Sequence, residues 1–371
     1  MRRKPIYLLS AVLVLTLSLC SCRHASSIVN EEHSDTLQLL YARNLLIIEH
    51  DDYTEVQIAN PWSSGTIMQT YEIRQPFTHA AIFIAAHAAL IDELGCLDAI
   101  AGVCEPEYIA DKNILEGISK GSIVNLGSAM VPDKESIINL SPDAILLSPF
   151  ENVGSYSNLE QLGLPIIQCS DYMEPTALGR AEWIRFYGRL FGCAELADSL
   201  FNSIAYRYNA LCEAVAADST GASPTVMFDT RNGSAWYMPG GQSTLASLVR
   251  DAGGSYIFAD DTHSGSIPLS FETVFDRGQD ADVWFIRYSS SLPLTLSQLR
   301  SMYAPYAKFK AFNHNGIYAC NNKDLIFYEE TPFHPDRLLH DFIKILRPQA
   351  LSPYDENEGL RYFQPLSPDS Q

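Results

Sequence analysis

Three short segments near the start of the folded region, over residues 45–50, 53–58 and 66–73, are rich in apolar, aromatic and β-branched residues. Short segments of this composition, bounded by turn residues, predict β-strands. Asn60 and Pro61 supply a turn signal between the last two segments. The pattern therefore predicts a small β-extension ahead of the main body of the protein, within residues 22–75.

Short continuous apolar runs and amphipathic segments alternate in two later parts of the chain. Apolar runs of this kind are typical of parallel strands that are covered by helices on both faces. In the first part, the pattern predicts strands over 80–85, 100–104, 144–147 and 166–169, with helices over 87–94, 134–139 and 157–162. In the second part, it predicts strands over 225–229, 283–287 and 317–320, with helices over 243–252 and 335–345.

Between these two parts, residues from about Pro175 to Ala217 carry apolar side chains at a spacing of three to four. No proline interrupts this segment after Pro175, and only Gly188 and Gly192 weaken its pattern. The spacing predicts one long helix, or two nearly continuous helices, over 174–218.

The two α/β parts also resemble each other. Glu135 lies near the start of a predicted helix that leads to a strand introduced by Asp143, and Glu272 and Asp282 repeat this order. We therefore expect two related lobes joined by the helical segment. The boundaries that follow are 76–173 for the first lobe, 174–218 for the linker helix, 219–350 for the second lobe and 351–371 for a C-terminal tail.

Charge and cysteine content exclude several classes of function. The chain has 44 acidic and 25 basic residues, so its net charge of −19 argues against nucleic-acid binding. The histidines are scattered and the cysteines form no Cys-x-x-Cys pair, so we expect no metal site. Six cysteines follow Cys22, and their pairing stays open; we expect free buried thiols.

The amino terminus has the composition of an export signal. Arg2, Arg3 and Lys4 precede an apolar run over 6–19, which is too short to span a membrane. The run ends in Leu-Cys-Ser-Cys, which resembles the lipobox of bacterial lipoproteins with Cys22 as the acylated residue. We therefore expect a signal peptide over 1–21 and a lipid-anchored protein that faces the periplasm. The alternative is an ordinary cleaved signal with an incidental cysteine.

Several segments in this order resemble one family, the periplasmic substrate-binding proteins of ABC importers for cobalamin, ferric siderophores and haem. The resemblance extends from about Tyr71 to Pro348. The segments that carry it are Ala89–Val103, Asn125–Ser128, Glu135–Leu147, Leu159–Ile167, Trp236–Ala246, Asp251–Gly254 and Glu272–Phe275. It implies an α/β fold with two Rossmann-like lobes, each built on a parallel sheet, bridged by a long rigid α-helix, with the ligand held in the cleft between them.

Ligands of α/β folds bind beyond the carboxyl ends of the strands, which selects the loops of the cleft. The candidate ligand-binding residues are His87 and Tyr108 in the first lobe and Arg231, Trp236, Tyr237, Arg287 and Tyr288 in the second. We expect Trp236 and Tyr237 to form an aromatic wall, with the alternative that Trp236 belongs to the core. The arginines would meet carboxylates or catecholates of a siderophore, unless they are solvent-exposed.

The resemblance implies a binding protein that captures an iron chelate, as a siderophore or haem, or cobalamin, and delivers it to the membrane subunits of an ABC importer. It also implies that Glu135 and Glu272 dock the two lobes on those subunits. We expect a monomer without a resident cofactor, and no enzyme, because the common catalytic motifs are absent from the sequence. The alternatives are an exported enzyme that acts on such a chelate, for instance by releasing its metal, and a chain that has lost transport and serves as a binding partner in the envelope.

Overall fold

The computed structural model describes residues 34–150, 157–218, 221, 223–323, 325–351 and 359–366. The predicted signal peptide and Cys22 lie outside these residues. Residues 34–371 belong to one unit, within which both lobes and the linker lie. Within the described part, no helix combines the length and apolar character needed to cross a membrane.

The N-terminal extension is a four-stranded antiparallel sheet in the order of the chain. Its strands are β1 (Ser34–Leu37), β2 (Leu45–His50), β3 (Thr54–Ala59) and β4 (Ile67–Ile73). Leu45, Ile47, Val56 and Ile58 are buried, so alternate residues of β2 and β3 form the buried face of this sheet. The pattern did not predict β1, because its polar sequence has no apolar face and it is held by backbone pairing with β2.

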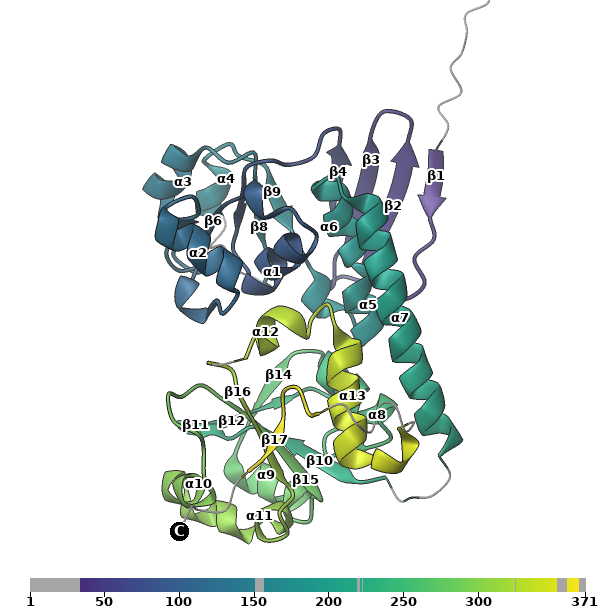
Figure 1. Cartoon of the computed structure of the whole chain (residues 1–371), viewed down its shortest axis with the longest axis vertical. Helices are drawn as coiled ribbons and strands as arrows, with labels where there is room; N and C mark the ends of the chain where they lie inside the picture. The colour runs from purple at the N-terminus through teal and green to yellow at the C-terminus, as the bar shows by residue number, and fades with distance from the viewer. Residues whose placement is uncertain are drawn as a thin grey trace, which may run out of the picture. The chain divides into compact units, whose positions relative to one another are not determined.

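The first lobe contains a five-stranded parallel sheet, drawn in blue and teal in Figure 1. The strand order is β7 (Val124–Asn125), β6 (Ile100–Val103), β5 (Ala80–Ile82), β8 (Ala144–Leu147) and β9 (Ile166–Gln168). Its helices are α1 (Ala85–Glu93), α2 (Lys112–Lys120), α3 (Lys134–Leu140) and α4 (Ser157–Glu160). All predicted elements of this lobe are present, and β7 and α2 are additional.

The second lobe contains a related sheet. Its order is β13 (Ser255–Tyr256), β10 (Thr225–Phe228), β15 (Val283–Tyr288), β16 (Ile317–Asn321) and the antiparallel β17 (Gln364–Pro365). Its main helices are α8 (Thr244–Asp251), α9 (Phe271–Gly278), α10 (Leu296–Met302), α11 (Lys310–Asn313), α12 (Phe327–Glu330) and α13 (Pro335–Leu346). A smaller sheet joins β11 (Arg231–Asn232), β12 (Ala235–Pro239) and β14 (Ser266–Leu269). Part of the predicted tail belongs to this lobe, because Tyr362 and Phe363 are buried beside β17.

Two aspartates show that the lobes are built alike. Asp143 Oδ2 accepts hydrogen bonds from the backbone N–H groups of Thr78 (2.7 Å) and His79 (3.0 Å), just before β5. Asp282 Oδ2 accepts one from the backbone N–H of Thr225 (2.8 Å), at the start of β10. β5 pairs with β8, the strand that follows Asp143, and β10 pairs with β15, the strand that follows Asp282, so each aspartate makes the same connection in its own lobe.

The linker differs from the prediction of a helix over the whole of 174–218. It consists of α5 (Ala177–Glu182), α6 (Ile184–Leu190) and the long α7 (Ala194–Ala217). The chain reverses between α6 and α7 at Gly192, whose positive φ of 73° suits glycine. Helix α7 therefore packs against α6 at one end and against α13 of the second lobe. Apolar spacing continues through the turn because both helices bury one face, which is why the reversal was missed.

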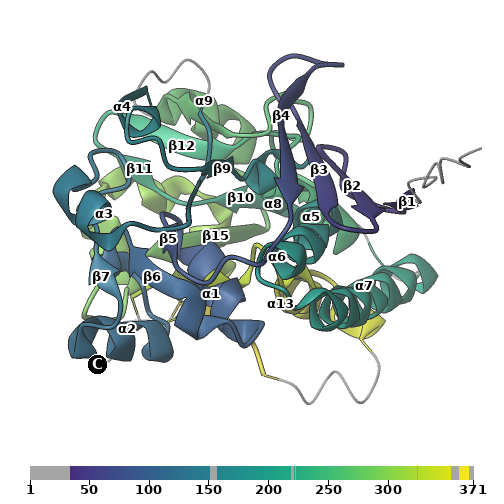
Figure 2. The ribbon, with the colours of Figure 1, turned by 90° about the horizontal axis from the view of Figure 1, so that it is seen from above.

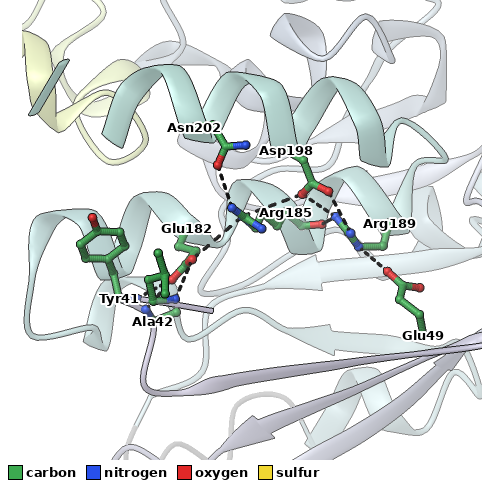
Figure 3. A network of polar contacts seen from close by, with 9 residues as sticks. Tyr41, Ala42, Glu49, Glu182, Arg185, Arg189, Asp198 and Asn202 are labelled. Atoms are coloured by element: carbon green, nitrogen blue, oxygen red, sulfur yellow. Dashed lines mark hydrogen bonds and ion pairs between the residues drawn. The ribbon is translucent and has the colours of Figure 1, made fainter. Parts of the chain in front are cut away.

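Charged side chains attach the N-terminal sheet to this linker. Arg189 of α6 forms ion pairs with Glu49 of β2 (2.8 Å) and Asp198 of α7 (2.8 Å). Glu182 of α5 is fully buried and accepts hydrogen bonds from the loop between β1 and β2 (Figure 3). The sheet consequently lies beside α5 and α6, as both ribbon views show (Figures 1 and 2).

Candidate functional site

A cavity of about 600 Å³ lies between the two lobes. The first lobe contributes the segment after β6, and the second lobe contributes the end of β15 and the segment after β16. The lining residues are Glu107–Ala110, Arg287–Ser291, Asn322, Lys323 and Tyr328. All these segments follow the carboxyl ends of parallel strands, where α/β folds bind ligands. The volume falls within the range of small-molecule sites.

Tyrosines from both lobes line the cavity. Tyr108 lies on a short 3₁₀ helix (Pro106–Tyr108) and is 74% exposed, and Tyr328 of α12 is 55% exposed. The Tyr288 hydroxyl accepts a hydrogen bond from the backbone N–H of Leu294 at 3.1 Å, which fixes its ring. Exposed aromatic rings on opposite walls can cover the faces of a large ligand. Tyr108, Tyr288 and Arg287, which the sequence predicts in one cleft, all line this cavity.

Arg287 is already paired with a carboxylate. Its Nε lies 3.0 Å from Asp229 Oδ1, its Nη2 also contacts Asp229, and its backbone N–H donates to the same side chain. Burial alone would lower the pKa of Arg287, but the ion pair with Asp229 outweighs it and raises this pKa. The guanidinium therefore adds little net positive charge to the cavity. Lys323 donates from Nζ to the hydroxyl of Ser291 at 2.6 Å.

The expectation that Trp236 forms a wall of the cleft is wrong. Its side chain is fully buried and packs against Trp284, Tyr306 and Phe309 in the second lobe. The indole Nε1 donates to the backbone carbonyl of Phe228 at 3.0 Å, so its polar group is satisfied inside the core. The alternative assignment of Trp236 to the core of this lobe holds.

His87 is also buried instead of lining the cavity. Its Nε2 lies 2.9 Å from Asp171 Oδ1, and Arg180 Nε lies 2.9 Å from the other carboxylate oxygen. Burial alone would raise the pKa of Asp171, but the charges of His87 and Arg180 lower it. The ring packs against Tyr187 of α6 and Phe333. These contacts make His87 a structural residue between the first lobe and the linker.

Two other predicted residues lie outside the lining of this cavity. Arg231 donates to the backbone carbonyl of Gly233 at 3.2 Å, and its guanidinium lies over the Tyr303 ring at 4.3 Å. Tyr237 is half-exposed, because it follows Trp236 in β12 and points to the opposite face of that strand. The structure therefore brings together three of the predicted ligand-binding residues, Tyr108, Arg287 and Tyr288.

Asn322, Lys323 and Tyr328 were missed, although a signal for them exists. They follow the carboxyl end of β16, so the rule that selected the other loops also selects this one. The same segment makes direct contact between the lobes. Glu329 accepts hydrogen bonds from the backbone N–H groups of Ala110 (3.0 Å) and Asp111 (3.1 Å), and burial raises its pKa.

The two predicted docking residues are both on the surface. Glu135 lies in the first turn of α3 after the N-cap residue Asp133, and Glu272 lies in the first turn of α9 after the N-cap residue Ser270. Both glutamates are exposed. Among the described residues, no group of three or more His, Cys, Asp and Glu side chains is arranged to hold a metal ion.

The comparisons with known proteins agree with this architecture. Residues 85–323 match the family model described as periplasmic binding protein. An uncharacterized lipoprotein of Methanocaldococcus jannaschii is 27% identical over 314 residues, which cover 81% of this chain and 73% of that protein.

Two solved structures share the fold. A periplasmic heme binding protein from Pseudomonas aeruginosa has a TM-score of 0.61 at 16% identity. The alignment covers 79% of this chain and 99% of that protein. An ABC-type Fe3+-hydroxamate transport system protein from Saccharomonospora viridis has a TM-score of 0.60 at 20% identity. The alignment covers 78% of this chain and 98% of that protein. At these identities the likeness concerns the fold, and the family follows from the model that spans both lobes and the cleft. The chain belongs to the periplasmic binding protein family.

Proposed function

We propose that this protein captures an iron chelate or cobalamin in the cavity between its lobes and delivers it to an ABC importer. The observation that supports this proposal is the cavity itself, which both lobes line at the carboxyl ends of their strands. Tyrosine rings and serine hydroxyl groups dominate its walls, which suits a large ligand with a few polar groups. The family assignment supports the same class of function.

The charges of the cavity favour a chelate of low net charge. The charged lining residues are Glu107, Lys323 and Arg287, and Asp229 compensates Arg287. A ferric tris-catecholate carries several negative charges and would find no matching cluster of cations among these residues. A ferric tris-hydroxamate, whose metal centre is neutral, or cobalamin places less charge on these walls. We therefore favour these two over ferric catecholates.

Intrinsic fluorescence quenching with a panel of ligands tests this preference. We expect saturable quenching by a ferric tris-hydroxamate or a cobalamin, and weaker binding of a ferric tris-catecholate. Tight binding of the catecholate at physiological salt would contradict the charge argument. Mass spectrometry of the bound ligand after incubation separates binding from the enzymatic alternative, because a binding protein returns the chelate unchanged and an enzyme converts it.

Tyr108→Ala should weaken the binding of that ligand by about 1–3 kcal/mol, the typical effect of losing a central aromatic contact. Tyr108 is highly exposed, so the fold should keep its stability. Tyr206→Ala is the matched control, because Tyr206 is 77% exposed on α7 and does not line the cavity. Equal affinities of the two variants would exclude Tyr108 from the binding surface.

Lipid anchoring through Cys22 forms a separate part of the proposal, and it rests on the lipobox pattern and on the relative named a lipoprotein. Cys22→Ala should move the protein from the membrane fraction to the soluble fraction of the envelope, because the thiol is the site of acylation. Fractionation and immunoblotting measure this, with Cys212→Ala as the control. A Cys22→Ala variant that stays with the membranes would show that another feature anchors the chain.

A further inference from the structure

Two cysteine thiols from different parts of the fold lie next to each other. Cys96 follows α1 in the first lobe, and Cys193 is the residue immediately before α7. Their sulfur atoms are 3.5 Å apart, although the residues are 97 positions apart in the sequence. Both side chains are partly exposed, so a small oxidant or an exchange partner can reach them.

The backbone on both sides holds this pair in place. The Cys96 thiol also contacts the backbone carbonyls of Leu94 (3.5 Å) and Phe191 (3.8 Å), so it lies directly against the turn between α6 and α7. The backbone N–H of Phe77 donates to the carbonyl of Leu190 at 2.8 Å, which attaches the start of the first lobe to the same turn. The two sulfur atoms need only a small side-chain rotation to come within bonding distance.

The other four described cysteines lack such a neighbour. Cys104, Cys169 and Cys320 are buried, and Cys212 lies on α7 in contact with the second lobe. Among the described residues, no other pair of cysteine sulfur atoms is in contact. The geometry therefore distinguishes one pairing among those that the sequence leaves open.

We propose that Cys96 and Cys193 form a disulfide bond in the exported protein and so join the first lobe to the start of α7. Members of this family work outside the cytoplasm, where disulfides persist. The reaction exchanges the two thiols with a disulfide oxidant: one S–S bond forms between Cys96 and Cys193, the oxidant's S–S bond breaks, and two protons and two electrons leave the protein to give two thiols on the oxidant. The proposal is independent of the ligand.

The bond would restrict motion between the first lobe and the linker. It closes the loop from Cys96 to Cys193, which contains β6 to β9 and α2 to α4 of the first lobe, whereas β5 and α1 precede Cys96. A cross-link across a loop of this length reduces the conformational freedom of the unfolded chain strongly. Burial and the neighbouring thiol raise the pKa of Cys193 to about 12, which slows its reaction both as an attacking thiolate and as a leaving group, so the bond forms and breaks slowly.

Peptide mapping tests the pairing in the wild-type protein. The protein purified from the cell envelope is treated with oxidised glutathione, alkylated and digested without reductant. We expect a cross-linked peptide pair that carries Cys96 and Cys193 and separates after reduction, while the other four described cysteines stay alkylated. The proposal is overturned if both residues are alkylated, if each carries glutathione, or if either pairs with another cysteine.

Thermal unfolding tests the consequence for stability. The oxidised wild-type protein should melt roughly 5–10 °C above the reduced protein. A Cys96→Ser/Cys193→Ser variant should melt at one temperature under both conditions, whereas Cys212→Ser should keep the redox-dependent difference. Equal melting temperatures of the oxidised and reduced wild type would show that the bond does not constrain the lobe. Ligand binding is measured in a separate experiment. The presence of the disulfide bond and the identity of the ligand are therefore decided independently.

Discussion

Glu182→Ala should lower the free energy of unfolding by about 3–5 kcal/mol, the typical cost of breaking a buried charged network. The Glu182 side chain is fully buried. Its two oxygens accept hydrogen bonds from the backbone N–H groups of Leu40 (3.0 Å), Tyr41 (2.7 Å) and Ala42 (2.8 Å). Alanine would leave these donors without their partner, and each buried unpaired N–H carries its own desolvation cost.

The large expected effect also reflects the position of this residue in the fold. Glu174 binds the next two backbone N–H groups, those of Arg43 (2.9 Å) and Asn44 (2.9 Å), so two carboxylates hold the loop between β1 and β2. This loop and the Arg189–Glu49 ion pair attach the N-terminal sheet to the linker (Figure 3). Loss of Glu182 should therefore loosen the whole sheet and not a single turn.

Denaturant titration followed by circular dichroism measures this change. Glu182→Gln should lie between the wild type and Glu182→Ala, because the amide retains one acceptor oxygen but brings a donor toward the backbone N–H groups. Glu213→Ala is the matched control, since Glu213 is an exposed glutamate of α7. If Glu182→Ala and Glu213→Ala have the same stability, the carboxylate does not hold the loop.

The architecture could be predicted from the sequence because each lobe repeats the same local pattern. The apolar runs and the aspartates before β8 and β15 are local features that the fold uses directly. The small antiparallel sheet that carries Trp236 and Tyr237 shows the limit of this reasoning. Adjacent strand residues point to opposite faces, and only the packing of β12 against Trp284 and Phe309 determines that Trp236 is the buried one.

Long-range pairing was the other information that the sequence could not supply. Apolar spacing predicts the helical residues of 174–218 but not the reversal that brings Arg189 to Asp198. His87 follows a predicted strand, as a cleft residue should, yet its partner Asp171 lies 84 positions away and holds it in the interior. The contact with a distant partner therefore decides the place of His87, and the turn at Gly192 decides the path of the linker.

Glu135 and Glu272 are the remaining part of the transport proposal. Each is exposed in the first turn of the helix that precedes the strand introduced by Asp143 or Asp282, so the two glutamates occupy equivalent places in related lobes. The helix N-terminus favours a carboxylate at such positions in any protein, and this preference alone would explain them. A transporter with two similar membrane subunits would meet one glutamate from each lobe, which gives their equivalence a functional reason.

The variant Glu135→Ala/Glu272→Ala should therefore reduce ligand-dependent uptake to the background of cells that lack the protein, while ligand affinity stays unchanged. Both side chains lie outside the lining of the cavity, so binding and docking can be separated. The control removes one exposed carboxylate from each lobe away from these two positions, as Glu160→Ala/Asp280→Ala, where Asp280 follows the end of α9, and should retain uptake. Transporter ATPase stimulation in liposomes, measured at several salt concentrations, gives a second readout, because contacts between exposed charges weaken as salt rises. Full uptake by the first variant would mean that other residues dock the lobes, whereas equal losses in both variants would mean that only the overall negative charge of the protein matters.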